Sequence, residues 1–256
     1  MSYPINYPTP QGANVQIFNY KGLIAKGTQV WTKPQGASMV WFTLIGAGGG
    51  GGGTDGVSDF CGGGSGAVTN LMIPAFLVPD NLAIKVAVGG EGALASNGAG
   101  GNASLTAVKT FFDRDSDILF AEGGGGGTIA TGAGGQAMGA NYFTAAGFFQ
   151  SVTGQAGTTS VPSASGGTFL QGGGVAGFST SNYGYVNGAG ATQGAAGYFQ
   201  MSPIIVGVSG TGSASSGVNA GKFIGGIGCG GAGTTAAVGP TNGSNGGNGL
   251  AVIITW

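Results

Sequence analysis

The chain has 256 residues, of which 61 are glycine, and its seven basic and eight acidic residues give a net charge of −1. A charge this close to zero excludes the basic patch that nucleic acid or an anionic membrane surface requires, and no apolar run approaches the ~20 residues of a membrane-spanning helix. The absence of histidine removes Ser-His-Asp and Cys-His catalysis and the commonest metal ligand. The composition therefore predicts a non-enzymatic protein without cofactor, metal site, nucleic-acid partner or membrane insertion.

Glycine in this quantity opposes folding, because each glycine loses about 0.5–1 kcal/mol more than alanine in backbone freedom on ordering. Disordered chains, however, are poor in hydrophobic residues and rich in charge, whereas this chain is 41% hydrophobic and 6% charged. The glycines also come in short runs rather than with the even spacing of a linker. We therefore expect an ordered chain that forms one domain.

The N-terminal residues 1–26 contain three early prolines and are interpreted as an arm that contacts another subunit. They have no basic region followed by an apolar one, so the sequence predicts a protein made in a cytosol and kept there or carried out inside an assembly. The domain proper is expected over 27–256, with a strand-rich part over 27–122 and glycine-rich repeats over 123–256.

Runs of β-branched and aromatic residues predict antiparallel strands, and no segment has helical periodicity. Residues 34–36 are expected to form a turn between the first two strands, and residues 113–117 the turn of a hairpin. The Asp113-x-Asp115-x-Asp117 spacing resembles the opening of a calcium loop but lacks the glycine and glutamate that complete one, so a solvated turn is favoured. The predicted strands are 27–32, 39–45, 68–73, 82–88, 103–112, 118–121 and 250–256.

The strands 39–45 and 250–256 bracket the domain, and both are dominated by apolar, β-favouring residues. Domains tend to bring their ends together. We therefore expect these two strands to lie in one sheet, adjacent or nearly so.

Six consecutive glycines, Gly48 to Gly53, follow the strand 39–45. Without Cβ atoms, such segments can adopt a left-handed helix of three residues per turn, called polyglycine II, and pair their amides with neighbouring helices. The alternative is that the glycine runs are loops, for which six glycines are a poor choice. The predicted fold class is all-β or irregular without significant α-helix, in which antiparallel strands are combined with a bundle, or sandwich, of polyglycine II helices. The segments expected in the bundle are 46–53, 122–135, 172–177 and 225–233.

An internal repeat marks the second half of the chain, because the sequence AAGFFQ at 145–150 recurs as AAGYFQ at 195–200. Each copy is followed by a polar stretch and then by another glycine-rich run. A repeated frame with unlike inserts predicts display loops, which are expected over 148–165, 178–186 and 198–220.

Tyrosine among serine, glycine and asparagine is typical of adaptable binding surfaces. A binding role is favoured for Tyr183 and Tyr185, whereas Phe149 and Phe199 are expected to cover the bundle, and the same alternative applies to Phe148. The candidate receptor-binding residues are Tyr183, Tyr185, Asn182, Tyr198 and Phe148.

Two cysteines, Cys61 and Cys229, each lie beside a glycine cluster. A disulfide between them is one possibility, and two small buried thiols in a reducing compartment are favoured. The isolated carboxylates Asp55, Asp59 and Glu91 are expected to be ordinary solvated side chains.

The run VWTKPQGASMV at 30–40, followed by a strand into Gly-Ala-Gly-Gly-Gly-Gly, resembles the opening of the glycine-rich domains of phage tail-fibre proteins. The ending GGNGLAVII at 246–254 resembles the closing strand of the same domains. The clustered glycines with variable loops are also similar to the fibre-tip adhesins of T-even-type phages, in which a polyglycine II sandwich displays loops that bind a bacterial outer-membrane receptor. Only residues 1–26 precede the glycine-rich domain here, whereas such adhesins carry a larger attachment domain.

This resemblance implies a tail-fibre or spike protein of a virion that is assembled in the host cytoplasm. Its partners would be a bacterial surface receptor, an outer-membrane protein or a glycan, and other virion or fibre subunits contacted through 1–26. One alternative is a purely structural capsid or fibre subunit that self-associates through the glycine-rich domain. Another is an ice-binding polyglycine-helix protein, which would need a regular threonine face and an export route, and the threonines here are irregular.

Overall fold

The computed structural model describes residues 12–20, 28–95, 98–110, 117–129, 132–133, 148–154, 156–157, 227–228, 230–231, 233–234 and 242–256. These residues form an all-β structure with one short 3-10 turn and no α-helix, and none of them belongs to a helix long and apolar enough to cross a membrane. The elements are β1 (Asn14–Asn19), β2 (Thr28–Thr32), β3 (Met39–Ile45), β4 (Val68–Pro74), η2 (Ala75–Leu77), β5 (Asn81–Lys85), β6 (Thr106–Thr110), β7 (Asp117–Ala121), β8 (Phe148–Val152) and β9 (Leu250–Thr255).

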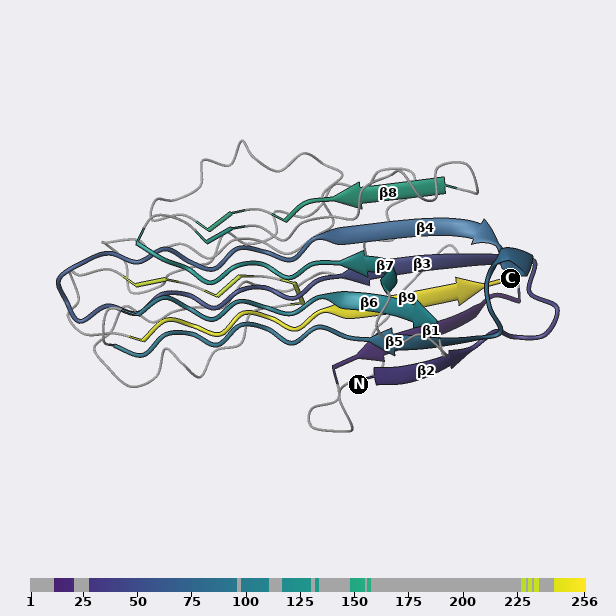
Figure 1. Ribbon diagram of the computed structural model, residues 1–256, viewed down its shortest axis with the longest axis horizontal. Coiled ribbons are helices and arrows are strands. Elements are labelled where there is room, and N and C mark those ends of the chain that lie inside the picture. The colour runs from purple at the N-terminus through teal and green to yellow at the C-terminus, as the bar shows by residue number, and fades with distance from the viewer. Residues whose placement is uncertain are drawn as a thin grey trace.

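The strands form two antiparallel sheets, one with the order β1-β9-β3-β4-β8 and the other with the order β2-β5-β6-β7 (Figure 1). The predicted adjacency of the first long strand and the last one is confirmed, because β9 pairs with β3 from Val40 opposite Thr255 to Ile45 opposite Leu250. On its other side β9 pairs with β1. The last strand of the chain is therefore an internal strand of its sheet.

The hydrophobic core lies between the two sheets and is built from alternate residues of each strand. Val40, Phe42 and Leu44 of β3 point into it, and the fully buried Trp31 enters it from the other sheet. The rings of Trp31 and Phe42 meet edge to face with centroids 6.1 Å apart, an arrangement that aromatic pairs prefer. The period-two alternation of these strands is what allows one face of each sheet to be buried.

Beyond the sheets the chain continues as long extended segments that run side by side away from the strands and back to them (Figure 1). The strand β5 therefore ends at Lys85, before the predicted end at residue 88, and β6 begins at Thr106, after the predicted start at residue 103. The boundary is set by Thr106, whose hydroxyl donates to the carbonyl of Ile45 at 2.7 Å and accepts from the amide of Ala87 at 3.1 Å. The Thr106 side chain thus replaces ladder bonds at this junction.

The predicted hairpin is confirmed by the antiparallel pairing of β6 with β7, although Asp117 belongs to β7 rather than to the turn. The Asp117 carboxylate lies 2.9 Å from the ammonium group of Lys109, which is its neighbour across the hairpin. This ion pair joins the two strands of the hairpin next to the predicted turn. The other residues of the predicted turn lie outside the described residues.

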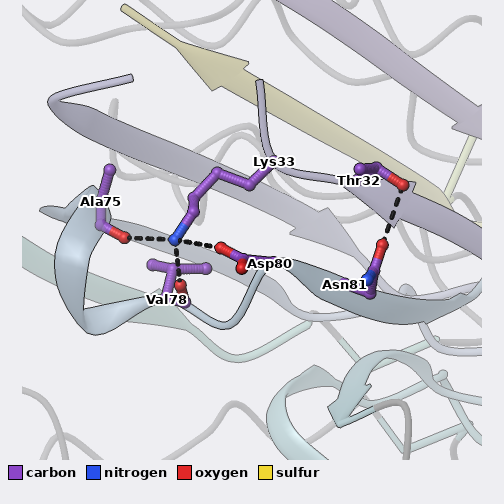
Figure 2. Close-up of polar contacts among 6 residues, drawn as sticks. All are labelled: Thr32, Lys33, Ala75, Val78, Asp80 and Asn81. Carbon is purple, nitrogen blue, oxygen red and sulfur yellow. Dashed lines mark hydrogen bonds and ion pairs between the residues drawn. The ribbon is translucent and has the colours of Figure 1, made fainter. Parts of the chain in front are cut away.

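Lys33 follows β2 and holds the turn that contains η2 (Figure 2). Its ammonium group donates to the carbonyl oxygens of Ala75 at 3.2 Å and Val78 at 2.8 Å, and it lies 2.8 Å from the carboxylate of Asp80. The bonds to two carbonyls fix the backbone path between β4 and β5. The predicted turn that follows Lys33 is present, with Gly36 at a φ of 79°, a left-handed conformation that glycine adopts without strain.

Part of the N-terminal arm lies in the domain itself. Residues Asn14–Asn19 of the predicted arm over 1–26 form β1, which pairs along its whole length with β9. The side-chain amide of Gln29 on β2 donates to the carbonyl of Asn19 at 2.9 Å and connects the two sheets at this edge. The contact between the arm and another subunit stays a prediction.

The internal position of β9 can be tested with Ile253→Ala. Ile253 is fully buried in the core between the sheets, so the loss of its side chain should lower the free energy of unfolding by about 2–5 kcal/mol. Chemical denaturation measures this change. The matched control is Ile129→Ala, because Ile129 is largely exposed, and its effect should stay within about 0.5 kcal/mol. Equal midpoints for the two variants would contradict this core.

Candidate functional site

We call the extended segments 46–53, 61–67, 86–95, 98–105, 122–129 and 242–249 the glycine block; residues 96–97, between two of them, are not described. Their backbone groups pair between segments rather than within them. The bonds recur every third residue. Gly48 donates to the carbonyl of Gly247 at 2.9 Å, and Gly51 donates to that of Ser244 at 2.8 Å. A β-ladder between two strands would instead repeat every second residue.

The segment 46–53 lies in the middle of the glycine block and is buried throughout. Its amides donate in rotation to segments 242–249, 61–67 and 98–105, and its carbonyls accept from 86–95, from 122–129 and from Gly231. Bonds in so many directions are impossible for a strand in a flat sheet, which has two neighbours. The longest glycine run of the sequence is therefore the central segment of the glycine block.

Glycine is required here because the backbones touch. A Cβ atom added to Gly49 or Gly50 would overlap the carbonyl of Gly125 or Glu91 respectively, and backbone atoms cannot move away as a flexible side chain can. The same holds where Gly246 faces the carbonyl of Gly48. At each of these positions the added Cβ would clash with main-chain atoms. The segments can therefore pack this closely only because these residues have no side chain.

Asparagine side chains satisfy amides at the outer side of the block. The Oδ1 atoms of Asn242, Asn245 and Asn248 accept from the amides of Ala95, Gly92 and Gly89 at 2.6, 2.7 and 3.0 Å respectively. The three asparagines are spaced three residues apart, and they are half-buried between fully buried neighbours. We call them the asparagine ladder. The spacing is visible in the sequence at 242–248 and was not used in the prediction.

The turns at the far end of the glycine block carry exposed apolar side chains. Val57, Leu94 and Ile129 are 76%, 72% and 65% exposed. Their turns lie at one end, since Gly53 pairs with Gly98 and the amide of Cys61 donates to Thr128 at 2.8 Å. We call this end, with the turns 54–59, 94–98 and 128–129 as far as they are described, the distal end.

The turn 54–59 is held by local bonds. The Thr54 hydroxyl accepts from the amide of Gly56 at 3.0 Å, and the Asp55 carboxylate accepts from that of Val57 at 3.0 Å. Asp55, Asp59 and Glu91 are exposed, as expected, and Asp55 also has this role in shaping the turn. The glycine block carries acidic residues but no lysine or arginine in its sequence. The distal end therefore exposes apolar and acidic side chains on turns, of which 54–59 is held by local hydrogen bonds.

Most of the predicted receptor-binding residues lie outside the described residues, namely Tyr183, Tyr185, Asn182 and Tyr198. The backbone of Phe148 begins β8 and pairs with Met72 of β4. Phe149 packs partly buried against the core between the sheets. The structure thus places residues 148–150 of the first copy of the repeat at a sheet edge. The second copy at 195–200 and the predicted glycine segment 172–177 lie outside the described part.

Cys61 is a buried free thiol in the glycine block. Burial raises the pKa of the Cys61 thiol above its ordinary value, so the group stays protonated and unreactive at neutral pH. Its Sγ lies 3.8 Å from the carbonyl of Ile129. Cys229 lies outside the described residues. Within the described ranges, no group of three or more acidic or cysteine side chains is arranged to hold a metal ion.

The model of a family described as glycine-rich domain matches residues 24–256 of this chain, and the chain therefore belongs to that family. A search of curated proteins found no match. The matched range starts before β2 and ends with the last residue of the chain, so both sheets and the glycine block fall largely within it.

The variant Gly50→Val tests the close backbone packing around the central segment 46–53. The added side chain would overlap the backbone at Glu91 and separate Gly50 from the groups it now bonds, Gly101 at 2.9 Å and Gly127 at 2.8 Å. Each orphaned buried group costs about 1–3 kcal/mol, so the variant should unfold at a much lower temperature or fail to fold. Gly98→Ala is the matched control, because its Cβ would meet the Ala93 side chain at an ordinary 3.4 Å. Melting of Gly50→Val like the unmodified chain would contradict the close packing.

The asparagine ladder can be tested at Asn245. Asn245→Leu keeps a similar side-chain volume but removes the acceptor for the amide of Gly92, whereas Asn245→Asp keeps an acceptor at the same place. We expect the leucine variant to lose about 1 kcal/mol of stability and the aspartate variant to lose less. Thermal unfolding of both variants measures the difference. Equal stability of the two would show that the side-chain bond contributes nothing.

Proposed function

We propose that the glycine block of this glycine-rich domain is a bundle of polyglycine II helices. The support is the three-residue recurrence of its lateral hydrogen bonds, since a helix of this type has three residues per turn and no internal hydrogen bonds. Each residue along such a helix directs its amide to a different neighbour, as the rotation of donors along 46–53 requires. The asparagine ladder has the same spacing.

The function that we propose is display. The protein is a tail-fibre or spike component of a virion, assembled in the host cytoplasm, and its glycine-rich scaffold presents loops to a receptor on the bacterial surface. The observation that carries this proposal is the distal end, where Val57, Leu94 and Ile129 are exposed on turns held by a rigid block. Isolated exposed apolar residues are ordinary, but three at one end of an elongated block suit anchors for a partner.

The predicted loops over 178–186 and 198–220, and the part of 148–165 that follows β8, belong to the same proposal. Their chain enters and leaves through the domain at β8 and at Gly228, which donates to the carbonyl of Asn248 at 2.9 Å. Tyr183 and Tyr185 would add aromatic anchors with polar groups around them. The receptor would be an outer-membrane protein or a glycan, and residues 1–26 would contact other subunits of the virion.

Attachment to susceptible cells tests this function. We expect Tyr183→Ala with Tyr185→Ala, a shortening of 201–218, and Val57→Ser with Leu94→Ser each to weaken binding by about tenfold or more, because anchor side chains contribute about 2 kcal/mol each. Binding should change little with salt, since the three predicted loops contain no charged residue.

The matched control is Phe76→Ser. Phe76 is also exposed, but it lies on η2, at the end of the sheets away from the glycine block (Figure 1). This variant should attach normally. If folded variants of the distal end and of the loops all attach like the unmodified chain, the display function is wrong and a purely structural subunit is the better description. Binding that collapses at high salt would point to a charged site instead.

A further inference from the structure

The strand β1 is an edge strand without the usual protection. Among the described residues it pairs with β9 on one side and ends the five-stranded sheet. Natural edge strands are commonly protected from pairing with other chains by a charge, a proline or a bulge. The sequence NVQIFN of β1 contains no charged residue and no proline, and its register with β9 is continuous.

The two edge strands of the four-stranded sheet differ from β1, whereas β8, the other edge of the five-stranded sheet, is also uncharged. The edge strand β7 begins with Asp117 in an ion pair with Lys109, and its register with β6 shifts beside that lysine. The edge strand β2 is followed directly by Lys33 and Pro34. Charge, irregular pairing and proline are the devices that discourage strand addition, so β1 is the open edge among these three.

The exposed side chains of β1 continue an apolar face that is otherwise covered. Val15 and Ile17 lie opposite Ile254 and Val252 of β9, so the four share one face of the sheet. Ile254 and Val252 are buried in a cluster on that face, whereas Val15 and Ile17 are 37% and 42% exposed. The apolar surface therefore runs on to the sheet edge and stops without cover there.

We propose that β1 pairs with β1 of a second copy of this chain, antiparallel and across a two-fold axis, to make one continuous sheet. A two-fold axis perpendicular to the sheet keeps each face on its own side, so odd-numbered residues must lie opposite odd-numbered ones. Centring the pair on Gln16 places Val15 opposite Ile17 of the second copy, and Ile17 opposite Val15 of that copy. Both apolar side chains are then covered.

The chemistry of the strand favours a second copy over a charged partner. Antiparallel self-pairing of an uncharged strand brings no like charges together. On the opposite face, the Gln16 side chain already bonds Asn14 at 3.1 Å, and two Gln16 amides would meet on the axis. A net charge of −1 on the whole chain gives little repulsion between copies. This inference goes beyond the proposed function and does not depend on receptor binding.

Sedimentation equilibrium of the full chain tests the pairing. We expect a reversible dimer in the micromolar range. The double variants Val15→Lys with Ile17→Lys, and Val15→Glu with Ile17→Glu, should each dissociate at least about tenfold more readily, and an equimolar mixture of the two should associate again. A monomeric unmodified chain, or a mixture that stays monomeric, would overturn the proposal. Val30→Lys, on the exposed face of β2, is the matched control and should dimerise normally.

The register has its own test. Val15→Glu combined with Ile17→Lys places opposite charges across the axis when the pair is centred on Gln16, so this chain should dimerise and its dimer should weaken with salt. Loss of this dimer, while the mixture of the two like-charged variants still associates, would overturn the centring on Gln16. Circular dichroism confirms folding of each variant. Cell attachment measured in parallel reports on the distal end, so failure of one proposal is distinguishable from failure of the other.

Discussion

The close approach of backbones in the glycine block is the constraint on which the rest of the structure depends. Segments that touch main chain to main chain have no room for a Cβ atom, as at Gly49 and Gly50. In exchange, every segment can bond laterally to several others, and buried amides find partners without a β-ladder. This network offsets the large conformational cost of ordering glycine. A block built in this way tolerates side chains only at its surface and at its ends.

The sheets and the glycine block support each other. Each segment of the block continues from a strand or leads into one, so the sheet register sets where each segment starts. The hydrophobic core between the sheets supplies apolar burial that the glycine block, with few side chains, cannot supply. The junction is bonded by Thr106, which contacts the backbone on both sides. The two sheets therefore fix the relative positions of the segments of the glycine block.

The two ends of the molecule consequently have different chemistry. The sheet end carries the described lysines, including Lys33, which fixes the turn at η2, and Lys109, which pairs across a hairpin. The distal end has acidic and apolar residues on turns that are short and locally bonded. Such an arrangement suits a protein that is anchored at one end and binds at the other, as the proposed display function requires. The proposed pairing of β1 with a second copy uses the sheets and does not involve the distal end.

The sequence by itself determined the all-β class, most strand positions and the pairing of the first long strand with the last, because runs of apolar, β-favouring residues indicate buried strands. It also singled out the run Gly48 to Gly53. Only the tertiary structure decided which segments surround that run, since the lateral hydrogen bonds join residues that are far apart in the chain. The one local pattern that these bonds leave in the sequence is the three-residue spacing of Asn242, Asn245 and Asn248. The same holds for the distal end. Val57, Leu94 and Ile129 are isolated in the sequence, and the return of each segment to a common sheet is what brings their turns together.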